Sequence, residues 1–206
     1  SAHYNASYLP GAGDSVTIDD SIIASPTVLL SSGTSTVFDF SAFANSPSGQ
    51  GGDTTFTMLN GTGLTSSNNF DLGYYNGSGT TTVNINQGAA VTVTGYFGGG
   101  RAGPHTTHLY GTLDAGTLEI GGADYVDLGS TGVITGGGND LNALDTSWIT
   151  QGLFTAAPGY KVVGTYDGTS DRTTISTAPV PEPATGALIL IGLGGLMMRR
   201  RKHETV

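Results

Sequence analysis

Four carboxylates in the middle of the sequence form the densest group of residues suited to acid–base or cation chemistry. They are Asp114, Glu119, Asp124 and Asp127. On adjacent turns of a stacked strand structure, such acids approach closely enough to bind calcium or to act on a glycan. A glycan lyase also needs a cation on the same strand face, and Arg101 alone is available in the middle of the chain. We therefore expect solvated, outward-facing acids and predict that the protein is not an enzyme.

Metal ligation has two other candidate groups. His105 and His108 stand three residues apart, but two imidazoles make a metal site only when a third ligand joins them. Asp14, Asp19 and Asp20 lie near the first expected strand, without the ligand order of an EF-hand loop or a calcium-binding nonapeptide. We expect these acids to belong to turns. The prediction is that the protein has no metal or other cofactor, with Ca²⁺ as the alternative.

The remaining motifs indicate no nucleophile or phosphate site. The glycine-rich stretch 98–103 lacks the lysine and the following helix of a P-loop, and no serine has a nucleophile-elbow context. Threonines recur at 80–82, Thr92 and Thr94. Aligned threonine rows on a flat solenoid order water, which makes ice binding an alternative. Threonine is also favoured at any exposed strand position.

Composition indicates an all-β body. The chain has 34 glycines and only 11% charged residues, and threonine, serine, asparagine and valine recur throughout. Cysteine is absent, which excludes disulfides and thiolate metal sites. Residues 1–180 contain three basic and fourteen acidic residues, a formal charge of −11. Such a surface repels phosphate backbones, so we predict no nucleic-acid partner.

Short pairs of apolar residues recur along the chain with Asn, Gly, Asp or Ser between them. Most have the form apolar-x-apolar, which directs two side chains of a strand inward and the middle one outward. The pairs are Val16 and Ile18, Val28 and Leu30, Val37 and Phe38, Phe56 and Met58, Phe70 and Leu72, Val83 and Ile85, Val91 and Val93, Leu118 and Ile120, and Val126 and Leu128.

A repeat is visible between residues 77–100 and 114–138, with an offset of about 35 residues. Strands that bury one face by stacking on their neighbours are typical of solenoids. The apolar residues of 139–154 predict a cap in which Trp148 covers the last turn, and the final strands are expected at 160–166 and 172–177. The predicted fold is a parallel β-helix or solenoid, with a β-sandwich or jelly roll as the alternative.

The C-terminal tail combines three elements in a fixed order. Pro181, Glu182 and Pro183 end a proline-rich linker at 178–183, where regular structure stops and the chain stays extended. The uncharged run 184–198 follows, and as a helix it spans about 22 Å against a hydrocarbon core of about 30 Å. The membrane stop is the basic cluster Arg199, Arg200, Arg201 and Lys202, which places the tail 199–206 in the cytoplasm.

This tail resembles the PEP-CTERM anchor found in many Gram-negative bacteria. The resemblance covers about residues 179–202 and implies recognition by an exosortase, a membrane peptidase or transpeptidase that acts near the Pro-Glu-Pro. It also implies an exported protein, anchored first in the inner membrane and then transferred to the cell surface or the extracellular polymer matrix. The chain starts at Ser1 without an apolar leader, so we expect that a signal peptide has been removed.

The body resembles autotransporter-like and PEP-CTERM-associated right-handed β-helix proteins. The resemblance rests on the stretch 10–18, on Phe70-Asp71-Leu72-Gly73 and on the stretch 77–80, and it covers about residues 9–138. It implies a right-handed β-helix displayed outside the cell. The expected division is a β-solenoid body at 1–177, the linker, a transmembrane helix at 184–198 and the basic tail.

Together these features predict an exported structural protein of the bacterial surface or extracellular matrix, associated with biofilm exopolysaccharide. The expected partners are exosortase, the inner membrane before processing, and extracellular polysaccharide. A β-helix module that binds carbohydrate, calcium or ice is the second hypothesis, and a polysaccharide lyase is the third.

Overall fold

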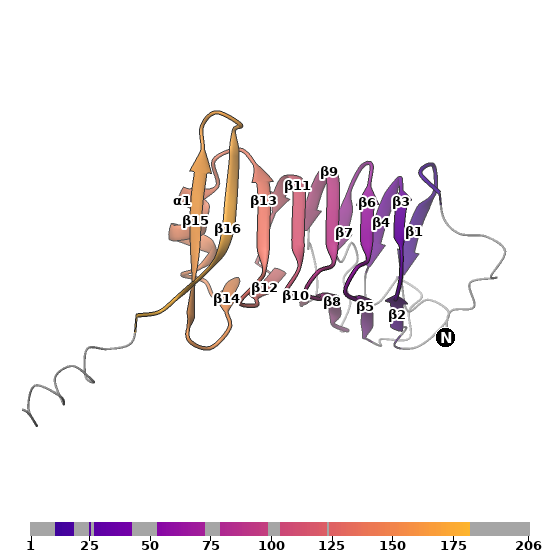
Figure 1. Cartoon of the computed structure of the whole chain (residues 1–206), viewed down its shortest axis with the longest axis horizontal. Coiled ribbons are helices and arrows are strands. Elements are labelled where there is room, and N and C mark those ends of the chain that lie inside the picture. Colours follow the sequence, from indigo (N-terminus) through magenta and orange to yellow (C-terminus); the bar gives the residue numbers. More distant parts are fainter. Residues whose placement is uncertain are drawn as a thin grey trace, which may run out of the picture.

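The computed structural model describes residues 11–18, 25, 27–42, 53–72, 79–98, 104–122 and 124–181. These residues form an all-β, parallel β-solenoid of about four turns. Two sheets run side by side along the long axis, and the chain alternates between them (Figure 1). We call the larger one sheet A and the smaller one sheet B. The predicted solenoid is confirmed.

Sheet B contributes one short strand to each turn. In spatial order its strands are β14 (Phe154–Ala156), β12 (Asp124–Leu128), β10 (His105–Leu109), β8 (Thr81–Ile85), β5 (Thr54–Met58) and β2 (Thr27–Leu30). All pairings between these strands are parallel.

Sheet A is built from longer or divided strands. Its strands are β1 (Ser15–Ile18), β3 (Thr34–Val37), β4 (Asp39–Ala42), β6 (Gly63–Ser66), β7 (Phe70–Leu72), β9 (Ala90–Gly98), β11 (Thr112–Glu119), β13 (Val133–Gly137), β15 (Tyr160–Asp167) and β16 (Arg172–Pro179). Strand β9 pairs with both β6 and β7, so one long strand replaces two shorter ones.

The apolar pairs fill the space between the sheets, as the period-2 pattern predicts. Both members of most pairs are buried, for example Val83 and Ile85 at 0% exposure. Phe38 is the exception, because it sits between β3 and β4 with 46% exposure while Val37 points inward. Strand parity therefore sorted the core correctly in all but this case.

A stack of phenylalanine rings runs through the core. Phe40, Phe70 and Phe97 occupy equivalent positions on β4, β7 and β9. Their ring centroids are 4.6 Å apart for the first pair and 5.2 Å for the second. Phe56 of sheet B packs on Phe40 with a centroid distance of 4.7 Å, which joins the two sheets. Such tilted pairs add to the stabilisation from burial.

The repeat of about 35 residues predicted from the sequence is wrong. Thr81 lies opposite His105, 24 residues later, and His105 lies opposite Asp124, 19 residues later. The earlier turns are longer, because Thr54 and Thr81 are 27 residues apart. The predicted offset equated β8 with the end of β11, which belong to different sheets. Corners of unequal length therefore hide the true period.

Glycines mark one corner of the first turns. Gly33, Gly61 and Gly88 lie between a sheet B strand and the following sheet A strand, with φ of 75°, 78° and 76°. This left-handed conformation is accessible to glycine at little cost. At Gly88 a side chain would also collide with Asn60, because a Cβ would lie 2.0 Å from the Asn60 Oδ1 atom.

The C-terminal end of the solenoid differs from the rest. Strand β16 pairs antiparallel with β13 and with β15, so a hairpin closes sheet A. The segment expected to be a cap contains the short helix α1 (Leu141–Ala143) and the π-helical turn η1 (Leu144–Trp148). The Trp148 ring stacks on Phe154 of β14, the last strand of sheet B, at 5.4 Å.

Carboxylates hold the turn of this hairpin. The Thr169 amide donates a hydrogen bond of 2.9 Å to Asp167 Oδ1, and this bond lowers the pKa of the Asp167 carboxyl. The Tyr166 hydroxyl donates to Asp171 Oδ1 at 2.7 Å, which raises the pKa of the phenol. The turn is therefore defined by its own side chains.

One buried hydroxyl in the core predicts a stabilising substitution. Thr107 is 1% exposed between Val83 and Val126, and within the described part of the chain its Oγ1 has no hydrogen-bond partner. Thr107→Val should raise the free energy of unfolding by about 1 kcal/mol in chemical denaturation, since it removes a desolvated polar atom. The outward Thr106→Val is the control and should change it by less than about 0.5 kcal/mol. Destabilisation by Thr107→Val would show that the hydroxyl has a partner.

Candidate functional site

The junction between the body and the tail is the first candidate site. Strand β16 ends at Pro179, which lies opposite Tyr160 in the hairpin. The Val180 amide then donates a hydrogen bond of 2.8 Å to the Gly159 carbonyl, while 49% of Val180 is exposed. Pro181 is exposed as well. The folded body therefore extends directly to the first proline of the Pro-Glu-Pro.

The rest of the tail lies outside the described residues. This applies to Glu182 and Pro183, to the expected helix at 184–198 and to the basic cluster Arg199–Lys202. Within the described ranges, no helix has the length and apolar character needed to cross a membrane.

The outer face of sheet B is the second candidate site. Residues at equivalent positions on neighbouring strands form rows, with about 4.8 Å between strands. The first row, which we call the threonine row, contains Thr27, Thr55, Thr82 and Thr106 and ends at Tyr125. The second, the polar row, contains Leu29, Thr57, Asn84, His108, Asp127 and Thr155.

Hydrogen bonds fix the side chains of the polar row. Asn84 Nδ2 donates to Thr57 Oγ1 at 3.0 Å. His108 Nδ1 lies 3.2 Å from Asp127 Oδ2, and Thr155 Oγ1 donates to Asp127 Oδ1 at 3.2 Å. His108 and Asp127 remain partly exposed, at 41% and 37% of their side chains. The row therefore presents preorganised polar groups to solvent.

Two tyrosines flank this part of the polar row. Tyr125 on β12 and Tyr110 just after β10 are each 42% exposed. The Tyr110 ring lies so close to Gly129 that a Cβ there would meet Tyr110 Cδ1 at 2.1 Å. Thr131 Oγ1 donates a hydrogen bond of 2.6 Å to the Tyr110 carbonyl. The glycine thus leaves room for an exposed aromatic ring at this corner.

The structure separates the two histidines of the expected metal pair. His105 faces the interior and is 2% exposed, whereas His108 faces outward in the polar row. Residues three apart on a strand point to opposite faces. They therefore cannot share a metal ion. No group of three His, Cys, Asp or Glu residues suited to a metal occurs in the described ranges.

The four carboxylates are also dispersed. Asp127 lies on the outer face of sheet B, while Asp114 and Glu119 face outward on sheet A. The expectation of a solvated acid is wrong for Asp124, which is 1% exposed and accepts a 2.8 Å hydrogen bond from the Gly121 amide through Oδ2. Because Asp124 begins its strand, this carboxylate can turn inward and still meet the backbone of the preceding turn.

Other candidate residues have structural contacts. Asp14 closes the turn before β1 by accepting a 2.8 Å hydrogen bond from the Gly11 amide, as expected for a turn acid. Arg172 Nη2 forms an ion pair with Asp114 and donates to the Ala115 carbonyl at 3.1 Å, which ties β16 to β11. Arg101, Asp19 and Asp20 lie outside the described residues.

The threonines singled out in the sequence do not share one surface. Thr81 points into the core at 0% exposure, whereas Thr82 faces outward on sheet B. Thr92 and Thr94 face outward on sheet A. Sheet A has a threonine row of its own, interrupted by Asp114; it contains Thr36, Thr65, Thr92, Thr135, Thr174 and Thr165.

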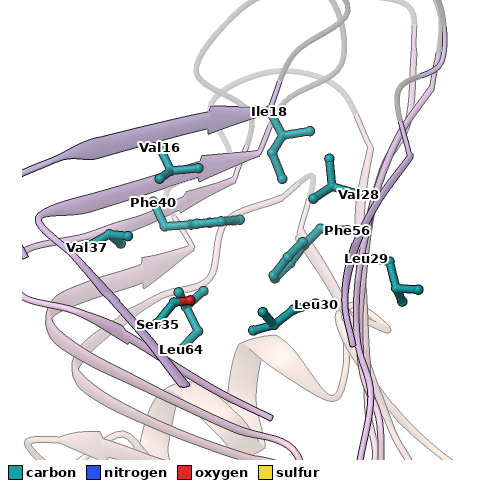
Figure 2. Close-up of a pocket in the computed structure, with 10 residues that line it drawn as sticks. All are labelled: Val16, Ile18, Val28, Leu29, Leu30, Ser35, Val37, Phe40, Phe56 and Leu64. Atoms are coloured by element: carbon teal, nitrogen blue, oxygen red, sulfur yellow. The ribbon is translucent and has the colours of Figure 1, made fainter. Parts of the chain in front are cut away.

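An apolar pocket of about 250 Å³ opens at the N-terminal end of the solenoid. Figure 2 shows the rings of Phe40 and Phe56 facing each other across it, with Val16, Val28 and Leu30 around them. Ser35 is the single polar residue among the described residues that line it. The pocket is the end of the core between the two sheets and has no group suited to acid–base chemistry.

Comparison with known proteins identifies the tail. The PEP-CTERM protein-sorting motif matches residues 179–202. Neither the curated proteins nor the solved structures contain a significant match to this chain. The motif indicates an exported protein that carries a membrane-anchored sorting signal and is processed by an exosortase.

Proposed function

We propose that this protein is a structural, non-enzymatic component of the bacterial cell surface or extracellular matrix, sorted through its PEP-CTERM segment. The observation that carries the proposal is the direct junction between body and motif. The folded hairpin ends at Pro179, and the matched segment begins at the same residue. A rigid body is thus coupled without a long linker to the peptide that an exosortase recognises.

The tail gives this body its orientation. We propose that residues 184–198 form a membrane helix and that Arg199–Lys202 keep its end in the cytoplasm, in line with the positive-inside tendency. The hairpin β15–β16 then lies next to the outer side of the inner membrane. Cleavage near Pro181-Glu182-Pro183 releases the solenoid from this helix for display outside the cell.

A structural role agrees with the arrangement of the polar residues. Asp114 is engaged by Arg172, Asp127 by His108 and Thr155, and Asp124 by the backbone of its own turn. These acids lie on different faces or in the core, so no pair of them is arranged for general acid–base catalysis. We propose that the body works by its surface and its rigidity, as a right-handed β-helix, without a cofactor.

A binding module is the second candidate, and the rows of sheet B favour it. The threonine row and the polar row form a regular, partly exposed surface on a flat sheet. A regular surface of this kind suits a ligand with a repeating structure. A carbohydrate polymer is one such ligand, and it is also a component of the proposed matrix.

Deletion of residues 181–206 tests the proposed function. In a host with an exosortase, the full chain should be processed to a shorter form at the cell surface or in the matrix. The truncated chain should be released unsorted into the periplasm or medium. Cell fractionation and intact-mass measurement separate these outcomes. Surface display of the truncated chain, or a mature wild-type protein that retains residues 184–206, would contradict the proposal.

A further inference from the structure

We infer that the outer face of sheet B binds a neutral polysaccharide between Tyr125 and Tyr110, over the His108–Asp127 pair. The inference deepens the proposed function and rests on it, because an exported protein is the one that meets such polymers. The four residues lie on or just after the adjacent strands β10 and β12.

The two tyrosines provide stacking surfaces. Both rings are 42% exposed, although a tyrosine of this size buries a large apolar area when it finds a partner. The apolar C–H face of a pyranose ring packs on such an aromatic ring. Tyr125 and Tyr110 lie four positions apart in strand register, which is about 13 Å along the strand direction. More than one sugar unit fits between them.

The polar row provides hydrogen-bond partners between the rings. His108 and Asp127 contact each other, Thr155 contacts Asp127, and Asn84 contacts Thr57. Their remaining donors and acceptors are directed by these contacts, so little side-chain entropy is lost when a sugar hydroxyl binds. Polar groups held in place beside exposed aromatic rings are typical of specific ligand sites.

Charge selects a neutral polymer over an anionic one. Residues 1–180 carry a formal charge of −11, and Asp127 lies in the middle of the proposed site. Lys161 and Arg172 lie on strands of sheet A. An anionic polymer would therefore meet a repulsive surface without a compensating cation on this face.

The composition of the rows favours a polymer over ice. A lattice of ordered water needs uniform positions, but the threonine row ends in Tyr125 and the polar row mixes Asn84, His108 and Asp127. Aromatic and ionisable side chains break the regularity of the array. The same side chains are the ones that recognise the faces and hydroxyls of sugars.

The test uses the full chain, purified in detergent and mixed with insoluble cellulose, chitin or starch granules. Wild-type protein should sediment with at least one of these polymers. Tyr110→Ala/Tyr125→Ala should reduce the bound fraction about tenfold, as expected for the loss of aromatic anchor residues. Tyr110→Phe/Tyr125→Phe should bind like wild type because the rings remain, and Thr36→Ala/Thr92→Ala on sheet A should also bind normally.

Several results would overturn the inference. These are absence of wild-type binding to all three polymers, undiminished binding by the double-alanine variant, binding to alginate beads alone, or inhibition of ice growth without polymer binding. Circular dichroism melting confirms that each variant is folded. Intact mass of the cellular protein tests sorting separately. A normally processed protein that binds no polymer refutes this inference alone, whereas an unprocessed wild type counts against the proposed function alone.

Discussion

Glu182→Ala is expected to block processing and to leave the full-length chain in the inner membrane. Glu182 is the charged residue of the Pro181-Glu182-Pro183 sequence within the matched motif. An enzyme that recognises this carboxylate loses a charge-assisted hydrogen bond, which contributes about 1.5–3 kcal/mol. The rate of cleavage should therefore fall about 10- to 100-fold.

Intact mass and membrane fractionation measure this outcome in a host that contains an exosortase. The control is Glu119→Ala, which removes an exposed carboxylate from strand β11 and should leave processing unchanged. If the Glu182→Ala protein matures at the wild-type rate, the carboxylate is not part of the recognition. Accumulation of both variants in the membrane would indicate a general export defect instead.

Phe70→Ala should destabilise the solenoid more than any other substitution considered. The ring is 0% exposed and contacts three other rings, at centroid distances of 4.6 Å to Phe40, 5.2 Å to Phe97 and 6.5 Å to Phe56. Its removal leaves a cavity in the middle of the stack, which costs about 3–5 kcal/mol. Domains are stable by about 5–15 kcal/mol, so much of the stability would be lost.

Chemical denaturation of the full chain gives this difference in the free energy of unfolding. Phe38→Ala is the matched control, because that ring is 46% exposed and its removal should change the free energy by less than about 0.5 kcal/mol. Equal effects of the two substitutions would mean that the phenylalanine stack does not hold the turns together.

Local patterns were sufficient to predict the inward residues of the strands. Val83 and Ile85, or Val126 and Leu128, are buried because alternate side chains of a strand face the same side. The same parity separates His105 from His108 once both are placed in one strand. The sequence interpretation placed them in a loop, and it therefore retained a metal pair that the strand excludes.

The candidate site on sheet B was beyond the reach of sequence reasoning. Its members are 19 residues apart between His108 and Asp127, 24 between Asn84 and His108, and 28 between Asp127 and Thr155. No fixed period aligns them, because the corners between strands differ in length. The glycines at positions 33, 61 and 88 mark equivalent corners of the first turns, and alignment on them would have revealed the longer spacing there.

The sequence by itself determined the sorting tail and the alternating core, because both depend on residues that are neighbours along the chain. The matched segment 179–202 is a linear order of prolines, apolar residues and basic residues, and it can be recognised without a fold. The tertiary structure decided which strands lie side by side, that Asp124 turns inward, and that an antiparallel hairpin closes sheet A. These features depend on corner lengths and on contacts between distant residues, since register in a stacked solenoid is set where the turns meet.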